Sequence, residues 1–197
     1  LFHAILAHPS DEYRSSLGRM AQYLDALMGD ARSLPFVGDD DGGRFFHPYG
    51  PRDRFGRATL TTAGWVLDRP EWITPDDMQE CAIWWLGPHV LQARGPAPVR
   101  NSEWFADAGV AVMNSSDAQC IVQAGRFGPI RGSHGHADKL SLVVRAAGQD
   151  FLIDPGTFTY DPLSPWRGVF RGTAAHNTVR VGGRDQAEPA GAFGWQE

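Results

Sequence analysis

The sequence predicts an α+β fold, with helices in the first half and antiparallel strands in the second. Before about residue 100, apolar residues recur at helical spacing, whereas afterwards short runs rich in Val, Ile and Leu are bounded by Gly, Asn, Asp or Pro. The run Gly95–Pro98 lies at this change and has the composition of a linker. We therefore expect a helical segment over residues 1–100 and an antiparallel β segment over 101–197. Both are expected to be incomplete, in a fragment whose N-terminus lies upstream of Leu1.

Two helices are expected in the first segment. The first begins after Ser10, a favourable N-cap, and runs through helically spaced apolar residues to Met28. The second begins with Thr74 as its cap, has a proline in the first helical position, and runs to Leu86. Between them, the Gly- and Asp-rich stretch 36–44 interrupts any regular element.

Five short apolar runs are expected to form strands in the second segment, because each is rich in β-formers and is flanked by turn residues. They are 109–113, 118–124, 140–146, 150–153 and 178–181. The Ala-Ala-Gly-Gln sequence at 146–149 is expected to be a hairpin turn.

Composition excludes several classes of protein. With 42% apolar and 11% aromatic residues, the chain has enough hydrophobic material for a packed core, which argues against disorder. No apolar run approaches the roughly 20 residues that a membrane-spanning helix needs, and the first residues do not form a signal peptide. The two cysteines, Cys81 and Cys120, lie in apolar runs and are expected to be buried free thiols. The absence of a CxxC motif argues against a thiolate zinc site.

The net charge of −5 is unevenly distributed. From Arg126 to Arg184, eight Lys and Arg residues face four Asp, so this segment carries +4 and the remainder −9. A basic excess of this kind either serves an anionic substrate or reflects an arginine-rich composition, and both explanations stay open. No basic helix or recognition motif indicates a nucleic-acid partner.

Three histidines and an aspartate in the second segment form a candidate metal site. His134 and His136 are two residues apart, so in an extended segment their side chains share one face. Asp154 ends an apolar run, and His176 precedes the run 178–181. Imidazole and carboxylate are ligands that zinc takes from proteins. We therefore expect a divalent cation to be held where neighbouring strands end.

Two other sequence patterns offer alternative metal sites. His134-x-His136-x-Asp138 matches the start of the HxHxDH motif of metallo-β-lactamase-like hydrolases, but Lys139 replaces the final histidine and a strand, not a helix, is expected to follow. The triple aspartate 39–41 could hold a cation, although its spacing does not match the alternating ligands of a calcium loop. A capped turn is favoured there.

Several linked motifs in the second segment resemble the heparinase II/III family of polysaccharide lyases. They are HGHADKLSL at 134–142, FLIDPGT at 151–157, FRGTAAHNTV at 170–179 and GRDQ at 183–186. The LPFVGDDDGGR sequence at 34–44 is also similar to a loop late in the family's helical domain. The resemblance implies the C-terminal part of an α/α toroid followed by the first strands of an antiparallel β-sandwich.

The same resemblance implies zinc bound by His136, Asp154 and His176, with His134 facing the substrate cleft. It also implies β-elimination on a uronate-containing acidic polysaccharide, similar to heparin, heparan sulfate or alginate, in the periplasm or outside the cell. In this chemistry a base removes the proton α to a carboxylate and an acid protonates the leaving oxygen.

We expect His134 to hydrogen-bond that carboxylate or share the base role. Arg171 and Arg167 are expected to grip anionic sugar groups, and Tyr160 to line the cleft or serve packing.

Two other functions stay open from the sequence, namely a metal-dependent hydrolase and a carbohydrate-binding β-module without catalysis. The family's catalytic tyrosine is expected upstream of Leu1, since none of the chain's own tyrosines lies in the matching motif. We therefore expect this chain alone to be a poor or inactive lyase. The sequence does not indicate an oligomeric state.

Overall fold

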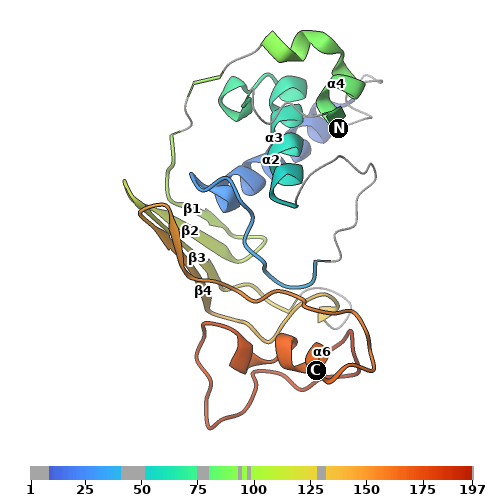
Figure 1. Cartoon of the computed structure of the whole chain (residues 1–197), viewed down its shortest axis with the longest axis vertical. Helices are drawn as coiled ribbons and strands as arrows, with labels where there is room; N and C mark the ends of the chain where they lie inside the picture. The colour runs from blue at the N-terminus through green and yellow to red at the C-terminus, as the bar shows by residue number, and fades with distance from the viewer. Residues whose placement is uncertain are drawn as a thin grey trace. The chain divides into compact units, whose positions relative to one another are not determined.

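The computed structural model describes residues 9–40, 52–74, 80–92, 95–96, 99–127 and 132–196. The chain divides into two compact units, each treated separately below. The first comprises Leu1–Leu34 and Arg44–Arg100, and the second comprises Pro35–Gly43 and Asn101–Glu197. The expected order of helices followed by an antiparallel sheet is confirmed (Figure 1).

Helices make up the regular structure described in the first unit. They are α2 (Asp11–Met28), α3 (Arg52–Leu67), η1 (Pro70–Trp72), α4 (Glu80–Leu86) and η3 (Pro88–Gln92). The expected first helix is confirmed as α2, and its cap Ser10 accepts a hydrogen bond from the Tyr13 N–H at 3.2 Å. The expected second helix corresponds to α4, although residues 75–79 lie outside the described residues. The sequence analysis missed α3, which supplies Leu60 to the buried core beside Met28.

The second unit contains a five-stranded antiparallel sheet in sequential order (Figure 1). Its strands are β1 (Glu103–Phe105), β2 (Val110–Asn114), β3 (Ala118–Gln123), β4 (Ser141–Ala146) and β5 (Gln149–Leu152). Val112, Ile121 and Val143 are aligned across β2, β3 and β4 and are buried. The expected hairpin turn is confirmed: Ala147 and Gly148 both have positive φ, as a type I′ turn requires.

The strand expected at residues 178–181 is wrong. These residues are described and pair with no strand, and the side chains of Val179 and Val181 are exposed. Their β-branched composition favours a strand, but the neighbouring groups take the chain elsewhere: the Thr178 hydroxyl donates to the carbonyl of Lys139. The last 40 or so residues instead form loops around α6 (Pro165–Arg171) and η4 (Thr173–Ala175).

Among the helices that the structure describes, none combines the length and apolar character needed to cross a bilayer.

Candidate metal centre

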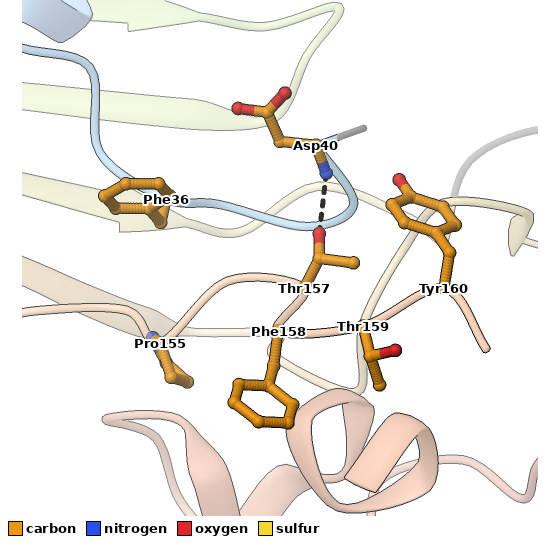
Figure 2. Close-up of a pocket in the computed structure, with 7 residues that line it drawn as sticks. All are labelled: Phe36, Asp40, Pro155, Thr157, Phe158, Thr159 and Tyr160. Atoms are coloured by element: carbon orange, nitrogen blue, oxygen red, sulfur yellow. Dashed lines mark hydrogen bonds between the residues drawn. The ribbon is translucent and has the colours of Figure 1, made fainter. Parts of the chain in front are cut away.

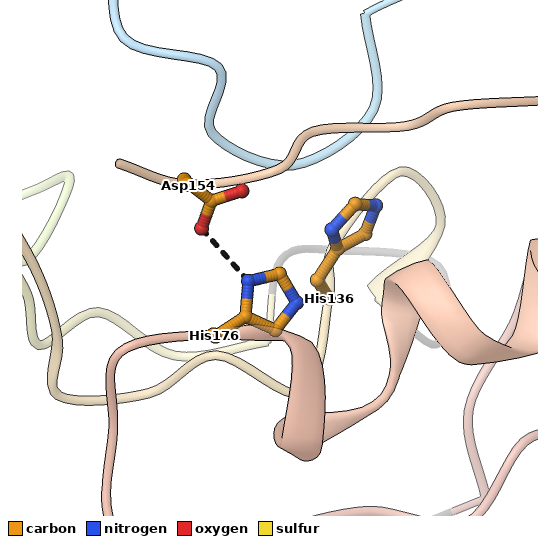
Figure 3. A group of neighbouring side chains, drawn as sticks. All are labelled: His136, Asp154 and His176. Atoms are coloured by element: carbon orange, nitrogen blue, oxygen red, sulfur yellow. Dashed lines mark hydrogen bonds and ion pairs between the residues drawn. The ribbon is translucent and has the colours of Figure 1, made fainter. Parts of the chain in front are cut away.

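His136, Asp154 and His176 come together in the second unit (Figure 3). All three are buried, and one donor atom from each lies within 4.8 Å of the others. A carboxylate and two imidazoles at this separation can bind a metal ion. The residues expected to hold the cation are therefore adjacent in space, although up to 40 positions separate them in the sequence.

Asp154 is held by a turn that follows β5. Its Oδ1 accepts a hydrogen bond from the Gly156 N–H at 2.9 Å, an Asx-type contact. Gly156 has φ +67°, and a Cβ at this position would lie 3.0 Å from the Cβ of Phe36. Glycine is therefore required here on two grounds, and the turn leaves Oδ2 of Asp154 directed at His176.

His176 follows η4 directly, and its neighbour Asn177 anchors it to the sheet. The Asn177 side-chain amide donates to the Leu142 carbonyl in β4 at 3.1 Å and to the Ile153 carbonyl at 2.7 Å. The Thr173 hydroxyl donates to the Ala137 carbonyl at 2.8 Å, which ties η4 to the residue after His136. These bonds join the three ligand-bearing segments.

None of the three residues lies within a strand, in contrast to the expected geometry. His136 lies in the loop before β4, and Asp154 lies two residues beyond β5. The segment 132–136 is a turn, not an extended run, and His134 has φ +67°. Its side chain is 65% exposed whereas that of His136 is fully buried. The two histidines therefore differ in environment, although they are two residues apart.

The hydrogen-bonding capacity of the two buried rings fits a bound cation. The Nδ1 of His136 and the Nε2 of His176 are buried, and neither has a hydrogen-bond partner among the described residues. The Nδ1 of His176 lies 2.8 Å from Oδ2 of Asp154. Burial lowers the pKa of His136, and the repulsion of His176 adds to this effect against the opposing influence of Asp39. A neutral imidazole with a free buried nitrogen is the form that binds metal.

Asp39 completes the surroundings of His136, and from the sequence it was considered only as part of the triple aspartate 39–41. Its carboxylate accepts both guanidinium N–H groups of Arg167, at 2.5 and 2.6 Å, and lies 3.0 Å from the Nε2 of His136. Burial alone would raise the pKa of Asp39, but the hydrogen bonds from Arg167 and His136 and the positive charge of Arg167 outweigh it and lower the pKa. The available signal was the aspartate-rich stretch itself, for which a capped turn was favoured.

Arg167 and Arg171, expected to contact substrate, are both buried at 2% exposure. Arg167 is engaged with Asp39, and its Nε donates to the Ala192 carbonyl at 3.0 Å. Arg171 donates to three carbonyls of the C-terminal segment 189–196 and lies 4.5 Å from the ring centroid of Trp195. This geometry gives both guanidiniums a role in holding the fold, and their contact with substrate stays a prediction.

Tyr160 lines a pocket of about 520 Å³ in the second unit (Figure 2). The pocket is also lined by Phe36, Asp40, Pro155, Thr157, Phe158 and Thr159. The Tyr160 ring stacks on Phe193 at 6.2 Å and lies 5.1 Å from the guanidinium carbon of Arg167. Tyr160 therefore both packs against Phe193 and Arg167 and borders the pocket. Its contact with substrate stays a prediction.

Comparison with known structures supports this fold. Heparan sulfate lyase HepC from Pedobacter heparinus matches with a TM-score of 0.64 and 17% identity, covering 89% of this chain and 25% of that one. A heparinase III gene product matches with a TM-score of 0.61 and 19% identity over the same shares. Another heparinase III structure gives 0.60 and 17%, covering 93% of this chain and 28% of that one. The chain thus spans about a quarter of the length of these structures.

Comparison with curated proteins gives no match. Residues 97–197, which include every ligand of the candidate centre, match the family described as heparinase II/III-like, C-terminal. This is a family of polysaccharide lyases. The chain belongs to the heparinase II/III-like family.

Proposed function

We propose that the chain is part of a lyase that cleaves a uronate-containing acidic polysaccharide by β-elimination. The observation that carries the proposal is the difference in exposure between two histidines of one short motif. The His134 side chain is 65% exposed, with its Nδ1 3.4 Å from an Asp39 oxygen, while His136, two residues later, is buried beside Asp154 and His176. Such an arrangement suits a reactive imidazole that is held in place by a buried metal centre.

In the proposed reaction, His134 acts at the uronate. β-Elimination removes the weakly acidic proton α to the sugar carboxylate, so negative charge grows on that carboxylate in the transition state. A protonated His134 would stabilise the charge by a hydrogen bond, or a neutral one would share the removal of the proton. The leaving glycosidic oxygen requires a separate acid. The family resemblance assigns that role to a tyrosine, and none of the chain's own tyrosines lies in the matching motif.

We further propose that the metal is Zn²⁺ and that His136, Asp154 and His176 hold it. Two imidazoles and one carboxylate form a typical zinc ligand set. Bound metal would cross-link three loop segments and so stabilise the turn that carries His134. All three ligands are buried, which favours this structural role over a hydrolase in which a zinc-bound water must reach the scissile bond.

The substrate class is proposed from the solved relatives and from charge. One relative is a heparan sulfate lyase, and the segment from Arg126 to Arg184 carries a net +4. Heparin- or heparan sulfate-like chains are therefore the first substrates to test, and alginate is the second. The family resemblance alone is the ground for proposing a periplasmic or secreted enzyme.

The test measures unsaturated uronate by ultraviolet absorption, using the chain and any longer gene product that contains it. His134→Asn is the informative variant, because asparagine tolerates the positive φ found at this position. We expect turnover in the active form to fall by roughly 10²–10⁴-fold, the usual contribution of acid–base catalysis, with metal content unchanged.

Asp154→Ala is the complementary variant, and we expect it to lose the metal. Products without a new double bond would indicate hydrolysis and refute the proposal. Glycan binding without turnover in the longest form would indicate a non-catalytic module.

A further inference from the structure

Asp39 lies beside the candidate metal centre on a loop that is 97 residues from His136 in the sequence. Hydrogen bonds attach this loop to the turn that carries His134 and to Thr157. The N–H of Asp39 donates to the His134 carbonyl at 2.9 Å. The next N–H, that of Asp40, donates to the Thr157 hydroxyl at 2.7 Å, and this hydroxyl donates to the Gly38 carbonyl at 3.4 Å. Bonds on both sides of Asp39 therefore fix the direction in which its carboxylate points.

The carboxylate of Asp39 is fully buried, and besides Arg167 and His136 it lies 3.4 Å from the Nδ1 of the exposed His134. Its contacts with Arg167 and His136 define where the protons lie. Arg167 is always a cation and donates to both carboxylate oxygens, so Asp39 is an ionised acceptor. The Nε2 of His136, at 3.0 Å from Oδ1, must then carry the hydrogen of this contact. In a neutral ring that leaves Nδ1 without a hydrogen, and Nδ1 is the atom that is buried without a partner. Figure 3 shows the His136 ring turned toward Asp154 and His176.

We propose that Asp39 is the positioning residue of the metal centre: it keeps the His136 proton on Nε2 and thereby presents Nδ1 to the cation. Arg167 is the second partner of the same carboxylate. The inference rests on the metal site of the proposed function and adds to it a residue 97 positions from His136. Carboxylates that accept a hydrogen bond from a ligand histidine fix its tautomer and strengthen its binding to metal.

The competing explanation is that Asp39 serves only as the partner of Arg167 in a buried ion pair. Two variants separate these roles. Asp39→Asn and Arg167→Met both break the ion pair, but only the first removes the carboxylate that His136 contacts. If Asp39 positions His136, the two variants lose similar stability, and Asp39→Asn loses much more metal affinity.

The experiment is a Zn²⁺ titration of the whole chain against a chromophoric chelator, with thermal unfolding of the metal-free protein as the measure of folding. We expect Asp39→Asn to weaken Zn²⁺ binding by about 10–100-fold, the effect usual for such partners of ligand histidines. A dissociation constant equal to that of wild type would overturn the role of Asp39 while leaving the metal site intact. A loss in Arg167→Met as large as that in Asp39→Asn would also overturn it.

Two further outcomes are decisive. Wild-type protein that is folded but binds no Zn²⁺ would overturn the metal centre itself, and the role of Asp39 with it. Should Asp39→Asn fail to fold, the tautomer of His136 in the metal-free wild type still tests the inference by ¹⁵N-edited NMR. Hydrogen on Nε2 is the expected result, and hydrogen on Nδ1 would contradict the proposal.

Discussion

Arg171 offers a sharp test, because the sequence assigns it to substrate and the structure buries it. Its guanidinium donates to the carbonyls of Gly191, Ala192 and Gly194 and lies over the Trp195 ring. Burial lowers the pKa of Arg171, with the charge of Arg167 adding to the effect. If the group holds the C-terminal segment 189–196 in place, replacing it should release that segment.

The size of the effect follows from these contacts. A hydrogen bond to a charged group contributes about 1.5–3 kcal/mol, and three are lost in Arg171→Met. The carbonyls lie on a largely exposed segment and can turn to water, so we expect a net loss of about 2–4 kcal/mol instead of the full sum. Arg171→Lys keeps the charge but not the fork of donors, and should lose about half as much.

Hydrogen exchange read by mass spectrometry is the appropriate assay, since it reports on the segment itself. Two backbone bonds within it, Ala190 N–H to the Gly194 carbonyl and Gln196 N–H to the Glu188 carbonyl, should exchange faster in Arg171→Met. The β2–β3 hairpin serves as an internal control. Unchanged protection of 189–196 together with weaker glycan binding would refute this structural role and restore the one predicted from the sequence.

Three further predictions follow from single groups. The pKa of Asp39 is lowered in the folded protein, so its ionised form stabilises the fold above about pH 4, the pKa in the unfolded chain. This stability is lost as the pH falls through the lower folded pKa. The free energy of unfolding should therefore change less with acid pH in Asp39→Asn than in wild type, and an equal pH dependence would contradict this. Cys120 is half-buried, and this burial raises the pKa of its thiol, so its alkylation near neutral pH should be slower in the folded than in the unfolded protein. Gly156→Ala should lower the free energy of unfolding by about 1–2 kcal/mol because of the positive φ, and by a further amount because the new Cβ crowds Phe36. Gly148→Ala is the matched control, because Gly148 also has a positive φ but no atom lies near its Cβ position.

Sequence signals predicted correctly those features that depend only on neighbouring residues. Ser10 predicted the start of α2, and the Ala-Ala-Gly-Gln sequence predicted the turn between β4 and β5, because capping and turn formation depend on neighbouring residues. The run 178–181 failed for the converse reason. Its β-forming composition is outweighed by contacts with distant groups, among them the Lys139 carbonyl, which accepts a hydrogen bond from the Thr178 hydroxyl.

The candidate metal site was only half accessible to sequence reasoning. His136, Asp154 and His176 could be grouped because each borders an apolar run in one segment of the chain. Asp39 could not be grouped with them, since only folding brings it to a residue 97 positions away. The burial of Arg167 was hidden for the same reason, because an arginine in a basic segment gives no sign that its partner is a distant aspartate.

The two buried arginines connect the C-terminal segment 189–196 to the rest of the second unit. Arg167 joins Asp39, and through it His136, to the Ala192 carbonyl, while Arg171 binds the same carbonyl and its neighbours. Trp195 adds a third link, because its indole N–H donates at 2.9 Å to the carbonyl of Gly135, which lies between the two histidines. The turn carrying His134 is thus held by the Trp195 indole and by the Asp39 N–H, which donates to the His134 carbonyl, and not by a strand. The position of His134 therefore depends on the C-terminal segment as well as on the metal ligands, because Trp195 of that segment binds the residue next to His134.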